Sequence, residues 1–445
     1  MTLNLRYEID KEQKEIETYY DFSSTLGILR AAEKCNGSAD CRKSDLIGGT
    51  MCPSYRATRD EKNTTRARAN TLREFLTRSN KQNPFDHKEI YEVMDLCLSC
   101  KACKSECPSG VDVAKLKSEF LQHWYDQHGI PIRSLLIAFL PKLNLFFSNF
   151  SSIVNSFLKS KFLMNLVGFT TKRNLPLLSK TTFMRWYKKN YKNYINKHYP
   201  NGKVNLFIDE FTNYNEVEIG IKAFKLLSKL GYEVSIPKHY ESGRTYISKG
   251  LLKSVKKIAN ENIRLLKDFV YEENPLVGIE VSAILSFRDE YLDLVNKDQK
   301  EDAIRLSKCS YTFEEFISNE IKKGKINSSL FVEEKQKILL HGHCHQKSIS
   351  STKFTIEMLS LPKNYSVEEI PSGCCGMAGA FGYEKEHYEL SIKVGELVLF
   401  PTIRKESDET ILCAVGTSCR HQIKDGTNKK SYHPIEILYD ALISK

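Results

Sequence analysis

The sequence predicts an α+β protein with an all-helical N-terminal domain, a basic helical connector and a duplicated α/β domain. Three observations support this fold class. The 13 cysteines form two groups, seven within residues 35–107 and five within 344–419, with one outside both. Residues 131–203 contain 13 Lys or Arg and no Asp or Glu. From Val204 onward, short apolar runs alternate with helical patterns, which is typical of α/β units.

Length and composition limit the classes of protein that fit. The 445 residues are 41% hydrophobic and 27% charged, which indicates a folded protein of about two or three domains. The sequence has no apolar run long enough to span a membrane, and residues 1–20 lack the apolar centre of a secretory signal. We therefore expect a cytoplasmic protein, in which metal binding explains the cysteines better than disulfides do.

The positive charge is local. The formal net charge is +11, and residues 131–203 contribute 13 positive charges, so the rest of the chain sums to 11 − 13 = −2. A nucleic-acid-binding protein carries a broader basic character, and we expect no nucleic-acid partner.

The densest cysteine motif is CLSCKACKSECP. Its spacing, C-x2-C-x2-C-x3-C-P, is that of iron–sulfur proteins, in which three thiolates bind one cluster and the fourth binds the other cluster of a two-cluster ferredoxin. Zinc sites more often present separated C-x2-C pairs. The cysteines of this motif are Cys97, Cys100, Cys103 and Cys107.

An altered copy of this motif precedes it. Cys35 and Cys41 have the same steps with Ser38 in the middle position, and Cys52 is followed by proline after an insertion. Under the crossover rule, the ligands of one complete [4Fe–4S] cluster are Cys52, Cys97, Cys100 and Cys103. A second site has three thiolates, Cys35, Cys41 and Cys107. It holds a [3Fe–4S] cluster, a [4Fe–4S] cluster with a non-cysteine ligand, or no cluster.

Helical patterns flank these cysteines. Residues 64–76 predict a helix with a polar, basic face, and residues 113–123, with Leu116, Phe120 and Leu121 on one stripe, predict another. Helices around cysteine loops favour an all-helical [4Fe–4S] ferredoxin domain over a β-rich one, and we assign residues 1–130 to it.

The C-terminal half contains a repeat. Strand and helix patterns recur at a nearly constant separation along the chain, which predicts two copies of one α/β unit, residues 204–310 and 311–445. The matched pairs are Glu210 with Cys344, Ser242 with Cys375, and Ala283 with Cys419. Because only the second copy has thiols at these positions, we expect a single metal centre in the half.

That predicted centre has four cysteine ligands, Cys344, Cys374, Cys375 and Cys419. The adjacent pair suits a multi-iron cluster, while zinc stays an alternative because nearby histidines offer nitrogen ligands. Those histidines are His343, His345 and His421, and for each a supporting hydrogen bond is the simpler role. Cys413 is expected to be a core thiol of a strand.

Several motifs together resemble a known family. They include GTMCPSYRATRDEKNTTRARA, CLSCKACKSECPSGVD, HGHCHQKS, SGCCGMAGAFGYE and GTSCRHQI, and they span nearly the whole chain. The chain resembles the C-terminal iron–sulfur half of bacterial FAD-linked D-2-hydroxyacid dehydrogenases that act on D-lactate or D-2-hydroxyglutarate. It is also similar to other cysteine-rich "CCG-domain" proteins, the glycolate oxidase iron–sulfur subunit and the cysteine-rich subunit of heterodisulfide reductase. Ala283 stands where we expect such proteins often to carry cysteine.

The resemblance implies an electron-transfer role. The segment before Cys35 is too short for the flavin domain of those dehydrogenases, so we expect FAD in a partner dehydrogenase subunit or domain. We assign no catalytic residue to this chain. The alternatives are a CCG-type disulfide reductase component and a zinc-structured binding or scaffold protein.

The connector, residues 131–203, combines its 13 cations with 13 aromatic residues. Basic, aromatic-rich helices bind anionic membrane surfaces, and they also serve as packed joints between domains. A membrane contact suits electrons bound for quinone, and it places the protein peripherally at the inner face of the membrane.

Overall fold

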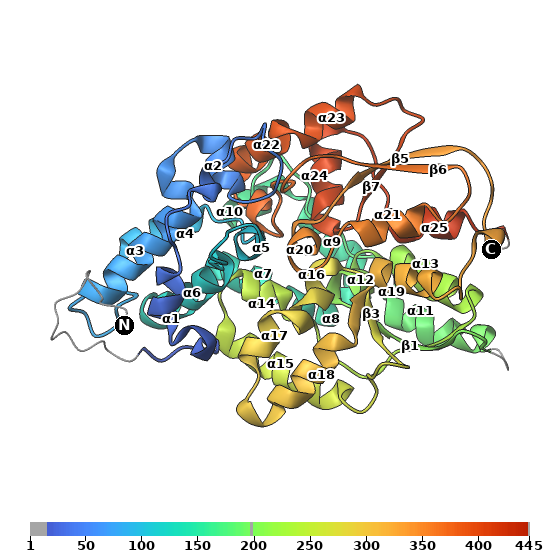
Figure 1. The fold of residues 1–445 in the computed structure, drawn as a ribbon, viewed down its shortest axis with the longest axis horizontal. Helices are drawn as coiled ribbons and strands as arrows, with labels where there is room; N and C mark the ends of the chain where they lie inside the picture. The colour runs from blue at the N-terminus through green and yellow to red at the C-terminus, as the bar shows by residue number, and fades with distance from the viewer. Residues whose placement is uncertain (1–15, 196–198, 444–445) are drawn as a thin grey trace.

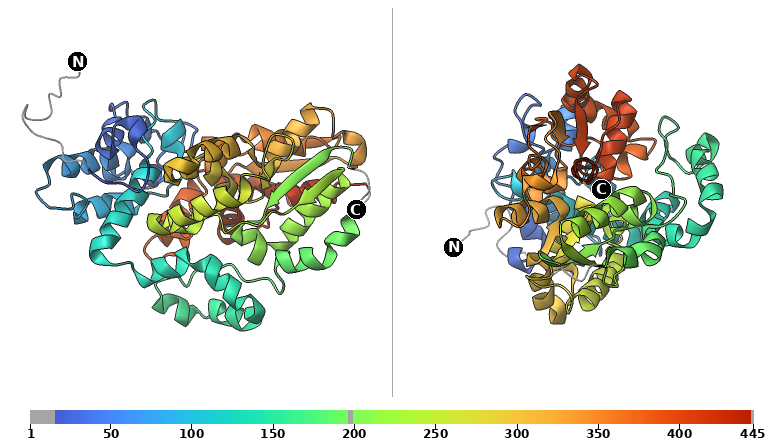
Figure 2. Two further views of the ribbon diagram at one scale, coloured as in Figure 1. Left: turned by 90° about the horizontal axis from the view of Figure 1, so that it is seen from below. Right: turned by 90° about the vertical axis from the view of Figure 1, so that its right-hand side faces the viewer.

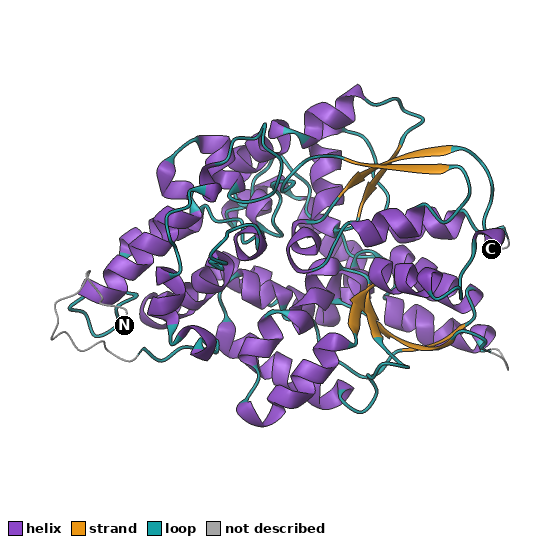
Figure 3. Ribbon diagram, viewed as in Figure 1, coloured by secondary structure: helices purple, strands orange, loops and turns teal. Residues whose placement is uncertain are grey.

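The computed structural model describes residues 16–195 and 199–443. Helices fill the N-terminal part, drawn in blue and cyan in Figure 1, and two sheets with their helices form the C-terminal half. In Figure 3, the strands of the described residues all lie in these two sheets. The predicted combination of helices with a separate parallel-strand region is therefore confirmed.

The N-terminal part, residues 16–130, is helical, with loops carrying the cysteines. Thr64 caps α3 by accepting from the Ala67 amide, and Ala69, Leu72 and Leu76 form its buried stripe. Asp112 caps α6, which ends at Gly129. The helices are α1 Ile28–Glu33, α2 Pro53–Thr58, α3 Thr65–Arg78, α4 Lys88–Asp95, α5 Ala102–Ser105 and α6 Val113–His128, with 3-10 turns η1 Ser23–Thr25, η2 Asp40–Arg42 and η3 Glu61–Asn63.

The connector is a chain of short helices along one side of the molecule, teal to green in Figure 2. Arg173 anchors it to the second sheet region, because its buried guanidinium contacts Ser391 and Gln422. The elements are α7 Ile132–Ala138, α8 Leu140–Phe147, η4 Ser148–Phe150, α9 Ser151–Lys159, α10 Lys161–Leu166, α11 Phe183–Asn190 and η5 Tyr191–Tyr194.

The first sheet is parallel with strand order β2-β1-β3-β4. Its strands are β1 Gly202–Phe207, β2 Tyr232–Ser235, β3 Leu276–Gly278 and β4 Ser310–Thr312. Its helices and turns are α12 Glu210–Tyr214, α13 Val217–Lys229, α14 Arg244–Ser248, α15 Leu252–Leu266, α16 Val281–Ile284, η6 Leu285–Arg288, α17 Glu290–Leu294, η7 Lys297–Gln299, α18 Lys300–Lys308 and α19 Phe313–Lys322.

The second sheet is also parallel, with strand order β6-β5-β7. Its strands are β5 Gln336–His341, β6 Tyr365–Glu369 and β7 Ile411–Ala414. Its helices and turns are η8 Ser328–Leu330, α20 Cys344–Ile349, α21 Lys353–Leu359, η9 Phe381–Tyr383, α22 Tyr388–Leu397, α23 Leu399–Lys405, α24 Thr417–Thr427 and α25 Pro434–Asp440.

The two sheets repeat one another in order and in spacing. The central strands β1 and β5 start at positions 202 and 336, and their neighbours β2 and β6 start at positions 232 and 365. The helices α16 and α24 start at positions 281 and 417. The separation is nearly the same for all three pairs and agrees with the separation found in the sequence. Equivalent loops therefore follow equivalent strands in the two units.

One feature at the boundary between the units differs from the prediction. We placed the boundary after residue 310, whereas Ser310–Thr312 forms β4 and pairs with β3 of the first sheet. Thr312 then caps α19 in a capping box with Glu315. A three-residue strand followed directly by a helix leaves too short a pattern for periodicity to detect.

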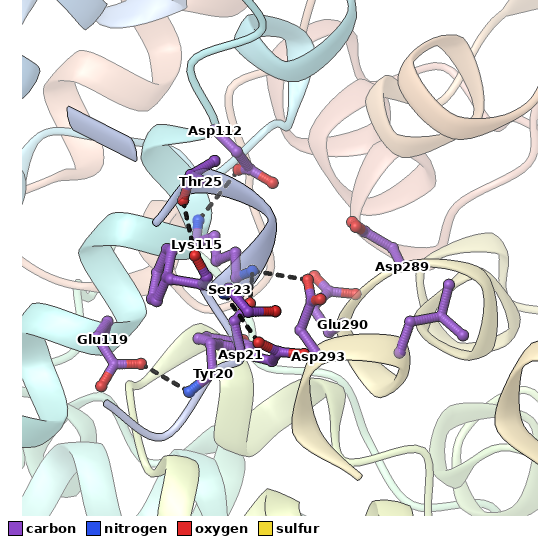
Figure 4. Close-up of polar contacts among 12 residues, drawn as sticks. Tyr20, Asp21, Ser23, Thr25, Asp112, Lys115, Glu119, Asp289, Glu290 and Asp293 are labelled. Carbon is purple, nitrogen blue, oxygen red and sulfur yellow. Dashed lines mark hydrogen bonds and ion pairs between the residues drawn. The ribbon is translucent and has the colours of Figure 1, made fainter. Parts of the chain in front are cut away.

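The helical N-terminal part is tied to the first α/β unit by charged and polar contacts (Figure 4). Glu119 of α6 accepts hydrogen bonds from the amides of Tyr19 (2.8 Å) and Tyr20 (3.0 Å). Lys115 of α6 pairs with Asp293 of α17 at 2.7 Å and donates to the Asp21 carbonyl at 2.9 Å. These contacts therefore hold the segment before α1 between α6 and α17.

Candidate metal centres

The loop that carries Cys97, Cys100 and Cys103 has a strained backbone. Ser99 and Lys101 have positive φ angles of 51° and 65°, which residues other than glycine rarely adopt. Lys117 of α6 donates a hydrogen bond to the Cys97 carbonyl of this loop at 2.8 Å. Burial raises the pKa of the Cys103 thiol to about 12, with contributions from the charges of Asp112 and Cys97. A metal must therefore displace the thiol proton when it binds.

Lys101, within the cysteine motif, is a site residue that the sequence analysis missed. Its side chain is 1% exposed and pairs with Asp112 (3.0 Å), Asp289 (2.8 Å) and Glu290 (3.3 Å). Asp289 and Glu290 belong to the start of α17, so this buried ion cluster joins the cysteine loop to the first α/β unit. A lysine between cysteines gives no sequence signal for burial, because lysine is normally exposed.

The two Cys-Pro segments are held together by one carboxylate. Glu106, which precedes Cys107, accepts hydrogen bonds from the amides of Thr50 (2.7 Å) and Met51 (3.0 Å), which precede Cys52. Such charge-assisted bonds are short and roughly twice as strong as neutral ones. Glu106 therefore brings the loop of Cys52 to the loop of Cys107, although the two loops are far apart in the sequence.

Cys52 lies between the two predicted clusters. Its sulfur accepts a hydrogen bond from the Thr65 amide at 3.1 Å. The Cys52 thiol also hydrogen-bonds to Cys41 and lowers the pKa of that thiol to about 6. The same bond, together with desolvation, raises the pKa of Cys52. The negative charge of a nearby Cys103 thiolate adds to this rise. Cys52 thus contacts Cys41 of one predicted ligand set and is within electrostatic reach of Cys103 of the other. The remaining two cysteines of the second set, Cys35 and Cys107, are half-buried.

The four C-terminal cysteines converge at the carboxyl end of the second sheet, where ligands bind in open parallel sheets. Cys344 is the first residue of α20, Cys419 lies in the first turn of α24, and Cys374 and Cys375 follow β6. Gly376 has a φ of 96°, and a Cβ there would lie 2.3 Å from the Ser391 carbonyl oxygen. This turn requires glycine, and it aims the cysteine pair inward.

The thiols of this group contact one another. Hydrogen bonds from Cys374 and Cys419 hold the pKa of Cys375 well below its usual value despite burial. A hydrogen bond from Cys374 likewise lowers the pKa of Cys344 to about 7. All four cysteines are buried. Two low-pKa thiols among four suit metal ligation, since the thiolate is the form that binds a metal.

His341, the last residue of β5, is a second site residue that we missed. Its ring and the sulfurs of Cys375 and Cys419 place three potential ligand atoms within 4.8 Å of one another. Nδ1 lies 2.8 Å from the Ser372 hydroxyl, and Nε2 is buried without a hydrogen-bond partner. Burial lowers the pKa of His341, which keeps the ring neutral. The sequence shows His341 as the first histidine of HGHCH, a possible signal for a ligand, but only the strand register places its ring beside the thiols.

The three histidines named from the sequence have other roles. His343 caps α20 through Nδ1, which accepts from the His345 amide at 3.2 Å. His345 donates from Nε2 to the Ser99 carbonyl at 3.1 Å, since a carbonyl only accepts. His421 Nδ1 lies 3.0 Å from the Tyr383 hydroxyl. Each makes a supporting hydrogen bond, while His341 faces the thiols.

Cys413, which we expected to be a core thiol, lies in β7 and is buried. Burial raises the pKa of this thiol well above its usual value, and the charge of Glu314 adds to the rise. A thiol held in its protonated form suits a strand core better than a metal site.

The equivalent site in the first unit is closed by a hydrogen-bonded pair. The Ser242 hydroxyl donates to Glu210 at 2.8 Å, and the Ser242 amide donates to the same carboxylate at 2.9 Å. Burial and the nearby Asp209 raise the pKa of Glu210 to about 7. Ala283 has no ligand atom. Within the described residues, the first unit forms no group of three metal-ligand atoms.

The N-terminal cysteine loop lies directly against the C-terminal cysteine site. Helix α20 packs on α5, and the Ser348 hydroxyl lies 3.5 Å from the Cys100 carbonyl. The His345–Ser99 hydrogen bond crosses the same contact. The charge of Cys344 also contributes to raising the pKa of Cys100, which burial dominates. Two cysteine groups from opposite ends of the chain are therefore neighbours.

A cavity of about 440 Å³, here called the central cavity, opens beside both cysteine groups. Its walls come from the cysteine loop, the connector helices and the C-terminal site. The cysteines that line it are Cys97, Cys344, Cys374, Cys375 and Cys419.

These residues fit metal centres. The C-terminal site has four buried thiols, a neutral imidazole with a free nitrogen, and open space beside them. Soft thiolate ligands select iron–sulfur clusters or zinc. The N-terminal loop presents three cysteines in the iron–sulfur spacing, with Cys52 held nearby.

Comparison with known proteins supports an iron–sulfur domain in the N-terminal part. Residues 34–112 match the profile of a family described as a 4Fe-4S dicluster domain. The chain is 25% identical to the D-2-hydroxyglutarate dehydrogenase of Escherichia coli strain K12 over 464 residues, covering 93% of this chain and 44% of that protein. The expected resemblance is therefore confirmed.

Two shorter relatives extend it. One is a subunit of the anaerobic glycerol-3-phosphate dehydrogenase of Escherichia coli strain K12, which is 26% identical, with 72% of this chain and 79% of the relative covered. Lactate utilization protein A 1 of Bacillus mycoides is 23% identical, with 54% of this chain and 96% of the relative covered. The chain spans less than half the length of the D-2-hydroxyglutarate dehydrogenases that it matches.

Proposed function

We propose that this chain transfers electrons through iron–sulfur clusters, from the flavin of a partner to an acceptor such as quinone. The partner is a FAD-binding dehydrogenase subunit or domain that oxidises a D-2-hydroxyacid. The observation that carries the proposal is the contact between the N-terminal cysteine loop and the C-terminal cysteine site, through His345 and Ser99. Electron carriers must lie close together, and this hydrogen bond joins the two segments that carry the cysteine groups.

The ligand assignment follows the cysteine groups. Cys52, Cys97, Cys100 and Cys103 hold one [4Fe–4S] cluster, and Cys35, Cys41 and Cys107 hold a second [3Fe–4S] or [4Fe–4S] cluster. The C-terminal site binds through Cys344, Cys374, Cys375 and Cys419, and His341 is a fifth candidate ligand. Bound clusters supply one-electron transfer. The chain's own residues hold the clusters, bury them and keep His341 neutral.

The domain division belongs to the same proposal. Residues 1–130 form the ferredoxin domain, 131–203 the connector, and the two sheets the CCG-type units, with the first sheet ending at Thr312. The first unit, whose thiols are replaced, packs against the cysteine loop through the Lys101 ion cluster. We therefore propose that it serves as a structural support for the electron path.

The test uses anaerobically purified full-length chain. We expect visible absorption, iron and acid-labile sulfide, and no FAD. Adding the partner flavoprotein and a D-2-hydroxyacid should bleach that absorption, and D-2-hydroxyacid alone should not. The matched control is Cys309→Ser, which changes a thiol outside both groups and should leave the spectrum unchanged. A colourless chain containing only zinc would contradict the proposal and favour the zinc-structured alternative. The ligand atoms of His341, Cys375 and Cys419 lie close enough together to bind one zinc ion.

We further propose that the connector binds an anionic membrane surface. Ten of the 21 large hydrophobic side chains exposed among the described residues lie within residues 132–166. Phe146 is 71% exposed and Phe162 77% exposed, and Lys142, Lys159 and Lys161 belong to the same run of helices. Exposed apolar groups beside cations are the pattern of interfacial helices. No single described helix is long and apolar enough to span a bilayer, although α7 followed by Leu140–Lys159 passes the length and composition test as a pair bent by 66°.

Vesicle binding tests this surface. The full chain should co-sediment with vesicles containing phosphatidylglycerol, and less with pure phosphatidylcholine, because the cations add an electrostatic attraction. The double substitution Phe146→Asp with Phe162→Asp should reduce binding by at least about tenfold, since carboxylates replace the apolar anchors. Phe269→Asp, at a side chain 53% exposed in the first α/β unit, is the control and should bind as the wild type does. Equal binding by all three proteins would contradict the proposed surface.

A further inference from the structure

We propose that the central cavity binds an amphipathic electron acceptor with a flat, uncharged polar headgroup and an apolar tail, which is the chemistry of a quinone. The headgroup lies between the C-terminal thiols and a polar wall defined below, and the tail lies along the connector helices. This inference rests on the proposed electron-transfer function and assigns a place to its acceptor.

The connector wall of the cavity is apolar. Helices α7 to α10 and the segment after them supply Leu136, Ile137, Leu140, Leu143, Met164 and Leu175. The same helices expose apolar side chains on their outer face, including Leu145 (67%) and Leu166 (74%). One set of short helices therefore separates the cavity from the proposed membrane surface. A ligand dissolved in the bilayer meets this wall first.

The opposite side, the polar wall, is a network of paired charges. His387 lies between two carboxylates, with Nδ1 2.8 Å from Glu384 and Nε2 3.0 Å from Asp95. Lys249 pairs with Glu384, and Arg133 pairs with Glu386. These side chains come from the end of α4, from α7, from the residue after α14 and from the loop after η9, and all of them line the cavity.

The balance of these charges selects the headgroup. Burial alone lowers the pKa of His387, but hydrogen bonds to Asp95 and Glu384 raise it overall, which favours the protonated ring between the two carboxylates. Each cation of the polar wall has a carboxylate partner, whereas Lys117, which also lines the cavity, donates to two backbone carbonyls. At the polar wall, an anionic hydroxyacid would have to displace one of these carboxylates. A neutral headgroup with carbonyl oxygens accepts hydrogen bonds here without breaking an ion pair.

The size of the cavity agrees with such a ligand. Pockets for small organic ligands and cofactors are about 300–1,000 Å³ and mostly apolar with a few polar groups. The central cavity, at about 440 Å³, lies within this range, and a cluster at Cys344, Cys374, Cys375 and Cys419 would take up part of that volume at its thiol end. The acceptor would then lie beside the last metal centre of the proposed path.

The test measures binding of 2-heptyl-4-hydroxyquinoline N-oxide, a redox-inactive quinone analogue, to cluster-loaded full-length chain by isothermal titration calorimetry. We expect saturable binding with one site per chain. Two substitution pairs locate it. Leu143→Trp and Met164→Trp place an indole in the cavity and should weaken binding by at least about tenfold. Leu145→Trp and Leu166→Trp, further along α8 and α10, point outward and should bind as the wild type does.

Two further measurements make the result decisive. The visible spectrum of every variant reports its folding and cluster content, and a variant with an altered spectrum is excluded. Two cavity and two outward substitutions are used so that one of each remains if another is excluded. Dodecanoate, with an apolar tail and an anionic head, should bind at least about tenfold more weakly than the N-oxide. Absence of N-oxide binding, tighter binding of dodecanoate, or equal binding by cavity and outward variants would each overturn the proposal. Failure of the flavoprotein to reduce the clusters, with N-oxide binding intact, would instead contradict the proposed function and leave the cavity assignment standing.

Discussion

Cys52→Ala and Cys100→Ala are expected to abolish the same [4Fe–4S] signal. The crossover rule gives both residues to one cluster, although they belong to different cysteine motifs. Two features of the tertiary structure are compatible with this pairing, while the Cys52 thiol contacts Cys41 of the other predicted set. Glu106 ties the segment before Cys52 to the second cysteine motif. Cys52 also lies within electrostatic reach of Cys103. Loss of one of four thiolates leaves a cubane iron without its protein ligand, so we expect complete loss of the intact cluster.

Electron paramagnetic resonance of the dithionite-reduced full-length variants measures this effect. Alanine is chosen because, unlike serine, it offers no replacement oxygen ligand. Cys309→Ala is the control, since this half-buried thiol lies in neither cysteine group. If Cys52→Ala keeps an unchanged signal while Cys100→Ala loses it, Cys52 belongs instead with Cys41, the thiol that it contacts.

Cys375→Ala is expected to remove the metal of the C-terminal half completely, whereas Ser242→Ala should leave it in place. Cys375 is the thiol held at low pKa by two neighbouring thiols, and its sulfur faces His341. Ser242 occupies the matching loop of the first unit, where its hydroxyl is engaged by Glu210. A metal needs deprotonated, electron-rich ligands, and only the second unit has them.

Iron and zinc per chain, measured on the full-length variants, decide the outcome. His341→Ala tests the fifth candidate ligand. Because this variant loses a neutral imidazole and keeps all four thiols, it should still bind metal at the C-terminal site but lose that metal faster during dialysis against a chelator. Ser242→Ala removes one hydrogen bond inside the first unit, so its thermal midpoint is recorded alongside. Metal loss in both variants, or metal retention in both, would show that the matched loops or the ligand set are wrong.

Much of the fold was predictable because its signals are local. The helix over residues 64–76 is α3, and the strand before Cys344 is β5, since apolar periodicity and capping residues act within a few positions. The duplication was predictable because equivalent strands keep nearly constant spacing along the chain. Cysteine spacing alone predicted the N-terminal iron–sulfur motif, as the turn of a short loop sets which thiols converge.

The sequence by itself therefore determined the helix over residues 64–76, the strand before Cys344, the repeat and the cysteine groups. Only the tertiary structure decided that Lys101 is buried among carboxylates of α17, that His341 faces the thiols in place of the neighbouring histidines, and that Ser99 meets His345. Each of these contacts joins residues from different elements or depends on strand register. Local spacing carries no information about such contacts, because they are formed by how helices and sheets pack against one another once the chain has folded.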